Sequence, residues 1–109
     1  MNTLTSYDGT TIAFERLGDG PPIVLVGESE PLATLLATRF TVYRYDRRGC
    51  GGSGNIAPYC LAREVEDLEA LIELAGGRAC VVALPSAAEL ASAAARALPC
   101  ITRLVTLPS

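Results

Sequence analysis

Two nucleophilic side chains stand where catalysis could be considered. Ser86 follows Pro85 directly after an apolar run, and Cys50 lies in a glycine-rich segment. A hydroxyl or thiol attacks a carbonyl efficiently only when a base takes up its proton and a third group orients that base. The chain contains no histidine and no lysine. Neither a Ser–His–Asp nor a Ser–Lys arrangement can therefore be completed within it.

Both nucleophiles also have a structural interpretation. The run Ser86-Ala87-Ala88-Glu89 matches the capping box S-x-x-E, in which the Ser86 hydroxyl accepts from the Glu89 N–H and the Glu89 carboxylate accepts from the Ser86 N–H. Cys50 has no paired base or general acid. We therefore predict that Ser86 caps a helix and that Cys50 is a loop thiol, and we assign neither as catalytic.

The densest group of carboxylates belongs to one expected helix, from about residue 58 to residue 75. Its apolar residues form a stripe at helical spacing: Leu61, Val65, Leu68, Ile72 and Ala75. The acidic residues fall between them: Glu64, Glu66, Asp67, Glu69 and Glu73. Without histidine partners this set does not predict a metal or acid–base site. We predict that these carboxylates face water.

The glycine-rich segment 46–54 contains the spacing G-x-G-x-x-G that is typical of dinucleotide-binding loops. Such a site also needs an acidic residue at the end of the following strand, which here ends Val82-Ala83-Leu84. The sequence therefore disfavours a nucleotide, and we expect no cofactor. Asp46 or Arg47 is expected to hold the loop in place by hydrogen bonds.

The composition describes an acidic protein of one domain, residues 1–109. Half of its residues are hydrophobic, which supports a core, and its net charge is -3. A partner that is a nucleic acid would require a basic surface. The arginines are scattered apart from Arg44, Arg47 and Arg48, and a phosphate patch there is an alternative that the acidic balance disfavours.

The four cysteines lie too far apart for a C-x-x-C centre, at Cys50, Cys60, Cys80 and Cys100. The sequence opens with neither a basic nor an apolar leader segment, so we expect free thiols and a cytoplasmic protein. No apolar run approaches the roughly 18 to 20 residues of a membrane span.

Strand and helix patterns alternate along the chain. Strands are expected at 10–17, 22–27, 40–45, 79–84 and 101–107, after a short first strand, and helices at 31–38, 58–75 and 87–98. This order predicts an α/β fold: a three-layer, mostly parallel, doubly wound sheet with about six strands and about three helices.

Several of these segments together resemble the N-terminal half of an α/β-hydrolase. A Gly-Pro-Pro run precedes an apolar strand, the loop 46–54 follows the next strand, and an acidic helix leads to a strand-to-helix turn. The resemblance extends from Tyr7 to Pro108 and stops where the second half of the family's fold would begin. It implies a truncated form of that fold.

The resemblance also implies a degenerate nucleophile elbow. Family members carry G-x-S-x-G after the strand, whereas this chain has Ala83-Leu84-Pro85-Ser86-Ala87, with Pro85 at the nucleophile position. Proline has no side-chain oxygen, and its ring holds φ at about -65°. The nucleophile of a strained elbow instead needs a positive φ. Glu28 and Glu30 follow Gly27, where the family builds its oxyanion hole, and a carboxylate there opposes a developing anion.

These observations favour a non-catalytic, hydrolase-like protein, a pseudoenzyme that acts through self-association or by binding a small ligand or a partner. A small apolar ligand is expected near Gly27, Glu28, Pro85 and Ser86. One alternative is an esterase-like hydrolase of the family whose acid and histidine come from a partner chain. Another is a decayed gene product without a selected function.

The last strand suggests how the chain associates. In a full-length relative another strand would lie beside it, whereas here its apolar residues are expected at a bare edge: Ile101, Leu104, Val105 and Leu107. An open edge pairs readily with another chain, and a two-fold axis would pair it with itself. We therefore expect a homodimer joined through this strand.

Overall fold

The computed structural model describes residues 2–54 and 60–108. Its strands are β1 (Asn2–Thr5), β2 (Thr11–Leu17), β3 (Pro22–Val26), β4 (Thr41–Tyr45), β5 (Ala79–Ala83) and β6 (Ile101–Thr106). Its helices are α1 (Glu30–Leu36), α2 (Leu61–Leu74) and α3 (Ala88–Ala97), with a short 3₁₀ turn, η1 (Pro85–Ala87), before α3. The predicted elements are confirmed to within a few residues, except that position 58 lies outside the described residues.

The described strands form one six-stranded sheet in the order β1-β2-β4-β3-β5-β6. β1 and β2 are antiparallel, as are β2 and β4, whereas β4, β3, β5 and β6 run parallel. The connection after β3 leads outward to β4, and the chain then returns to the other side of β3 to form β5. The carboxyl ends of β3 and β5 therefore flank the point where the strand order reverses, which is where open α/β sheets bind ligands.

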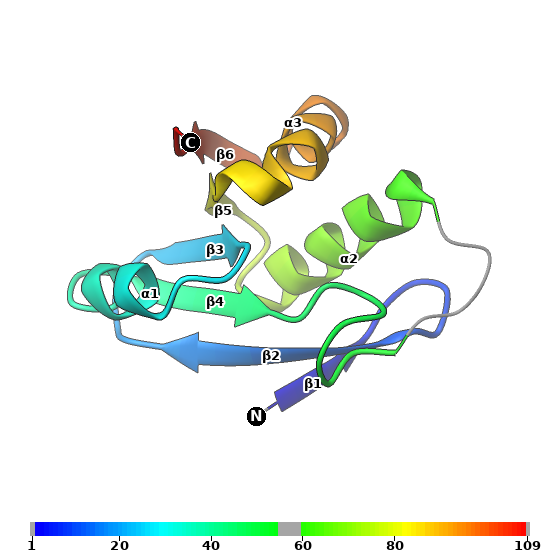
Figure 1. Cartoon of the computed structure of the whole chain (residues 1–109), viewed down its shortest axis with the longest axis horizontal. Helices are drawn as coiled ribbons and strands as arrows, with labels where there is room; N and C mark the ends of the chain where they lie inside the picture. The colour runs from blue at the N-terminus through cyan, green and yellow to red at the C-terminus, as the bar shows by residue number, and fades with distance from the viewer. Residues whose placement is uncertain (1, 55–59, 109) are drawn as a thin grey trace.

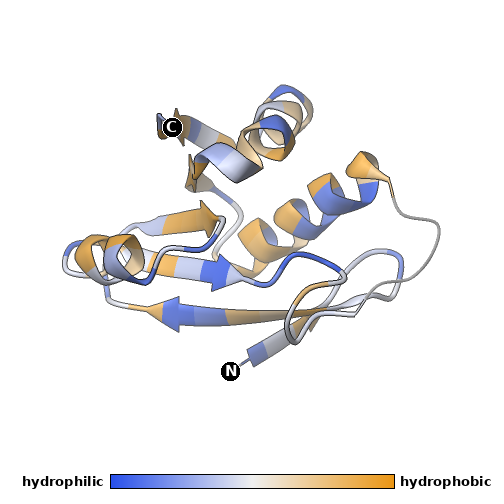
Figure 2. Ribbon diagram, in the orientation of Figure 1, coloured by the Kyte–Doolittle hydropathy of each residue, from blue (hydrophilic) through white to orange (hydrophobic). Residues whose placement is uncertain are grey.

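The helices cover the two faces of the sheet unequally (Figure 1). α2 and α3 pack side by side on one face, against Val24, Val26 and Val81. α1 lies on the other face, where Ala33 contacts a smaller cluster with Ile23 and Leu25. Alternate residues of β3 thus point into different clusters, because side chains of a strand alternate between faces. In Figure 2 apolar and polar residues alternate along α2, as expected for a helix with one buried face.

The predicted layers and parallel strands are confirmed, and the chain has the α/β architecture that its sequence pattern indicates. Among the described residues, no helix is long and apolar enough to cross a membrane.

Gly27 sets the approach of β3 to β5 at their carboxyl ends. The Leu84 N–H donates to the Val26 carbonyl at 2.9 Å, so the two strand ends remain paired beyond β5. Gly27 has φ +109°, and a Cβ on it would lie 2.8 Å from the Leu84 Cβ. Glycine is required here both for the backbone conformation and for the close contact.

Replacing Gly27 tests this contact against a matched glycine. Gly76 also has a positive φ, +118°, but a Cβ there would meet nothing within 4 Å. Both alanine variants carry backbone strain, and only Gly27→Ala adds a clash, so it should lose about 1–3 kcal/mol more unfolding free energy than Gly76→Ala. Urea denaturation of the two variants measures the difference. Equal losses would contradict a constraint from Leu84.

Candidate functional site

A cavity of about 330 Å³ opens at the carboxyl ends of β3 and β4, beside residues 13–15 of the antiparallel strand β2. Gly27 and Glu28 line it, as predicted for a ligand site, but Pro85 and Ser86 are not among its lining residues. Its ionisable lining residues are mainly acidic: Glu15, Glu28, Glu30 and Asp46, with Arg44. This lining is more polar than the predicted small apolar ligand would prefer.

Arg44 is the cation of this cavity, and it is already paired. Its Nη2 lies 2.7 Å from Glu30 Oε1 and 3.2 Å from Glu15 Oε2. Glu30, more than Glu15, raises the pKa of Arg44 above its usual value, and Arg44 lowers the pKa of Glu30. Because Arg44 is neutralised by its neighbours, the cavity does not offer a free cation to an anionic substrate.

The turn after β5 lacks the geometry of a nucleophile elbow. Leu84 has φ -73°, and Pro85 begins the 3₁₀ turn η1. Every positive φ among the described residues belongs to a glycine, so the strained conformation that presents a catalytic side chain is missing from this part of the chain. Ser86 is exposed on η1.

The prediction of a capping box at Ser86 is wrong. Neither η1 nor α3 has a side-chain hydrogen bond at its N-cap, and the N-cap residues are Leu84 and Ala87. Pro85 is favourable in a first helical turn because its φ is preset and it has no N–H to leave unpaired. It therefore starts the turn one residue before Ser86, which places Ser86 inside the turn instead of at its cap.

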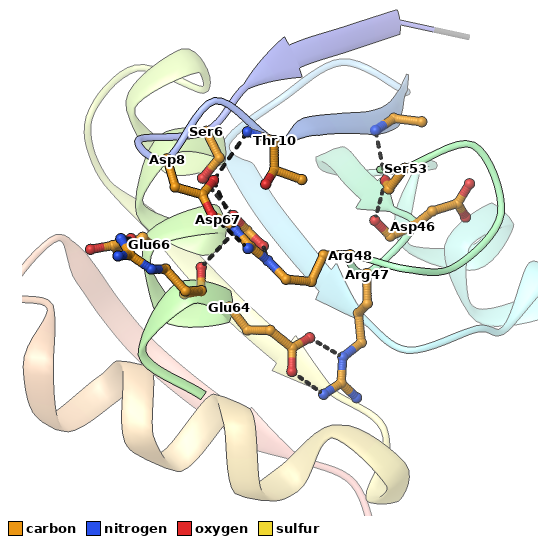
Figure 3. Close-up of polar contacts among 12 residues, drawn as sticks. Ser6, Asp8, Thr10, Asp46, Arg47, Arg48, Ser53, Glu64, Glu66 and Asp67 are labelled. Atoms are coloured by element: carbon orange, nitrogen blue, oxygen red, sulfur yellow. Dashed lines mark hydrogen bonds and ion pairs between the residues drawn. The ribbon is translucent and has the colours of Figure 1, made fainter. Parts of the chain in front are cut away.

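The prediction that all acidic residues of α2 face water is also wrong. Glu64 is 2% exposed and Asp67 is 1% exposed. Arg47 approaches Glu64 with two nitrogens, Nε at 2.6 Å from Oε1 and Nη2 at 2.8 Å from Oε2. Arg48 is likewise bidentate on Asp67, with Nε at 2.8 Å from Oδ2 and Nη2 at 2.6 Å from Oδ1. Figure 3 shows both arginines reaching from the loop to α2.

The buried Arg48 pair also fixes the turn between β1 and β2. Arg48 Nη1 donates to Asp8 Oδ2 at 2.8 Å, and the Ser6 hydroxyl donates to Asp67 Oδ1 at 2.5 Å (Figure 3). The Arg48 guanidinium, chiefly through this hydrogen bond, holds the pKa of Asp8 well below its usual range. Segments of β1–β2, the loop and α2 are thus joined at one point.

The glycine-rich loop is held on β2 by its own hydrogen bonds. The Asp46 carboxylate accepts from the Gly52 N–H at 2.9 Å, and the Ser53 hydroxyl donates to the Asp46 carbonyl and accepts from the Ala13 N–H. A Cβ at Gly51 would lie 2.3 Å from the Asp46 carboxylate. The expectation that Asp46 or Arg47 holds this loop is confirmed for both residues.

The three clustered arginines, Arg44, Arg47 and Arg48, are each engaged by carboxylates of this chain. This pairing argues against the phosphate-patch alternative. Cys50 is an exposed free thiol, and all four cysteines are free. Among residues 2–54 and 60–108, no group of three histidine, cysteine or acidic side chains could hold a metal ion.

Replacing Arg48 should be far more damaging than replacing an exposed arginine. Arg48→Met leaves Asp67 buried without its cation, and we expect a loss of about 3–5 kcal/mol. Arg63→Met, which removes the more exposed pair with Glu66, should cost about 1 kcal/mol or less. Urea denaturation measures both.

The double variant Arg48→Met/Asp67→Leu separates the charge from the packing. It should recover much of the loss, because both buried charges are removed together. A double variant as unstable as Arg48→Met would contradict the uncompensated-charge explanation.

Comparisons with known proteins agree on the family to which this fold belongs. The sequence profile described as "Alpha/beta hydrolase family" matches residues 23–107. An α/β hydrolase from Sphaerobacter thermophilus superposes with a TM-score of 0.91 at 52% identity, over 96% of this chain and 44% of that one. The enol-lactonase from Burkholderia xenovorans LB400 superposes with a TM-score of 0.82 at 27% identity, over 94% of this chain and 45% of that one.

A curated relative from Mycobacterium tuberculosis, "Probable oxidoreductase EphD", is 41% identical over 85 residues, which are 66% of this chain and 14% of that protein. The chain thus spans less than half the length of each of these relatives. Its match to the family profile covers the sheet from Ile23 in β3 to β6, with the cavity lining from Gly27 to Asp46 but without the lining residues of β2. The chain therefore belongs to the alpha/beta hydrolase family.

Proposed function

We propose that this chain is a non-catalytic member of its family, which acts by self-association and by binding instead of by acyl transfer. The observation that carries this proposal is Pro85, which the sequence pattern aligns with the family's nucleophile position and which begins a 3₁₀ turn without a positive φ. A side chain without a nucleophilic atom cannot form an acyl-enzyme intermediate. The lack of histidine in the sequence removes the usual base as well.

The electrostatics of the cavity support the same proposal. Acyl transfer requires donors directed at the oxygen that becomes negative in the transition state. Glu28 is exposed at the end of β3, and Glu30 follows it at the start of α1. Arg44, which could have offset these charges, is held by Glu15 and Glu30. The cavity therefore favours neutral or cationic groups over a developing oxyanion.

We propose self-association through β6. Among the described strands, β6 pairs only with β5 and forms one edge of the sheet. Val105 is exposed, while Ile101, Leu104 and Leu107 are half-buried. Pairing of two β6 strands across a two-fold axis would satisfy both edges and create a sheet that is continuous through two copies.

The alternative is an esterase-like hydrolase whose acid and histidine come from a partner chain. The order around the strand ends favours it: Gly27 packs on Leu84, and hydrogen bonds to Asp46 and Ser53 fix the loop after β4. In that case Ser86, which is exposed one residue beyond Pro85, is the candidate nucleophile.

Hydrolysis of short aryl esters tests the non-catalytic proposal. We expect the protein, Ser86→Ala and Cys50→Ala to show the same rate as buffer with an inert protein of equal concentration, because neither nucleophile has a base. Product release is followed by absorbance at pH 7 to 9. Saturable turnover that Ser86→Ala abolishes would refute the proposal and support the partner-chain alternative.

Light scattering at micromolar concentration tests self-association, and we expect the mass of two chains. The Leu107 N–H donates to the Ala83 carbonyl at 2.9 Å. Because successive N–H groups of a strand point to opposite sides, the N–H of the preceding residue, Thr106, points away from β5. Thr106→Pro removes this outward donor and should give a folded monomer. Thr3→Lys, on the opposite edge strand β1, should leave the mass unchanged. A monomeric unmodified protein would contradict pairing through β6.

A further inference from the structure

A second concave surface lies on the sheet face opposite α3. It is a groove of about 640 Å³ between α1 and the side of β5 and β6 that no helix of the described residues covers. Its apolar lining includes Ile23, Leu36, Phe40, Val82, Val105 and Leu107. The volume lies within the roughly 300–1,000 Å³ that is typical of small-molecule sites. Unlike the cavity beside Gly27, this groove has no acidic lining residue among the residues that the structure describes.

The charged groups that line the groove lie near one end of it. Arg78 immediately precedes β5, and Arg103 is in register with Cys80, the second residue of β5. Both arginines are exposed, and neither makes an ion pair with any described residue. Further along the strands, the lining is apolar at Val82 and at Val105, its partner in register. The groove is thus basic where β5 and β6 begin and apolar beyond.

We propose that this groove binds a free long-chain fatty acid. Its carboxylate would lie between Arg78 and Arg103, whose guanidinium groups match a carboxylate in geometry as well as in charge. Its alkyl chain would run along β5 and β6 over Val82, Val105 and Leu107. The inference is independent of the proposed non-catalytic role, because the groove shares no lining residue with the cavity beside Gly27.

The distribution of charge favours an amphiphile over a polypeptide. An amphipathic helix repeats its charged residues along its whole length, whereas this groove offers cations near one end only. A second copy would bring two further arginines against Arg78 and Arg103 if the two grooves faced each other, and like charges in an interface oppose association. A single anionic head with one apolar tail fits both features of the groove.

Cys80 provides a reporter inside the groove. Its thiol is half-buried and lines the groove, and desolvation raises its pKa. Cys50 and Cys60 are exposed and lie outside the lining residues. The alkylation rate of each cysteine can be followed by peptide mass spectrometry in the unmodified protein. An occupied groove should slow alkylation at Cys80 and leave Cys50 and Cys60 unchanged.

The probes are dodecanoate, octanoate and dodecylammonium, each below its micellar concentration. Dodecanoate should slow Cys80 alkylation saturably. It should bind more tightly than octanoate, because each buried CH₂ adds up to about fourfold in affinity. Dodecylammonium has the same tail and the opposite charge, so it should protect Cys80 much less.

Matched arginine variants test which side chains bind the carboxylate head group. Arg78→Gln and Arg103→Gln should each weaken dodecanoate binding by about tenfold, as expected for a lost charged hydrogen bond. Arg96→Gln, which changes an exposed arginine of α3 that does not line the groove, should bind as the unmodified protein does. Circular dichroism confirms that all three remain folded.

Four results would overturn the proposal. Unchanged alkylation of Cys80 with dodecanoate would show that the groove does not bind it. Equal protection by dodecylammonium, or protection unaffected by Arg78→Gln and Arg103→Gln, would show that no carboxylate site exists. Slow alkylation without any probe that accelerates on dilution would show that a second copy covers the groove.

Discussion

The arrangement of the loop after β4 depends on two ion pairs, a buried one at Arg48 and a half-buried one at Arg47. Arg48 and Asp67 are both almost fully buried, and their bidentate contact joins the loop to α2 while Asp8 and Ser6 bring the β1–β2 turn to the same point. Removing two charges from water is costly, and only good geometry with further hydrogen bonds offsets this cost. The partners present here meet that requirement. The pairs specify one placement of the loop more than they add stability.

The framework around the candidate site and the chemistry expected there are separable. Gly27 and Leu84 hold the ends of β3 and β5 together by packing and by a backbone hydrogen bond, and neither interaction involves a catalytic group. The turn after β5 needs only a helix start, which Pro85 supplies without strain. The packing at the strand ends does not depend on a strained turn that presents a nucleophile. A fold of this kind therefore does not by itself establish an activity.

The sequence predicted the strands and helices because apolar runs and helical spacing report burial directly. It failed at Glu64 and Asp67, since a pattern of hydrophobic residues assigns every carboxylate to solvent. Their partners Arg47 and Arg48 lie 17 and 19 residues away in the chain, and only the packing of α2 on the sheet brings them together. Two arginines directly after a strand, followed by acids spaced i, i+3 on the next helix, were the available signal. The groove at Cys80 has no comparable pattern in the sequence, because its lining residues come from separate segments of the chain.

The two concave surfaces differ in whether their arginines are paired with carboxylates. Beside Gly27, Arg44 is neutralised by Glu15 and Glu30, so the local field is negative. On the β5–β6 face, Arg78 and Arg103 have no acidic neighbour in the groove, although the chain as a whole carries a net charge of -3. Local pairing, and not net charge, therefore decides where an anion can bind. The proposed pairing through β6 would use the backbone edge of that strand, whereas the proposed fatty-acid site uses its face, so the two proposals call on different groups of the same strand.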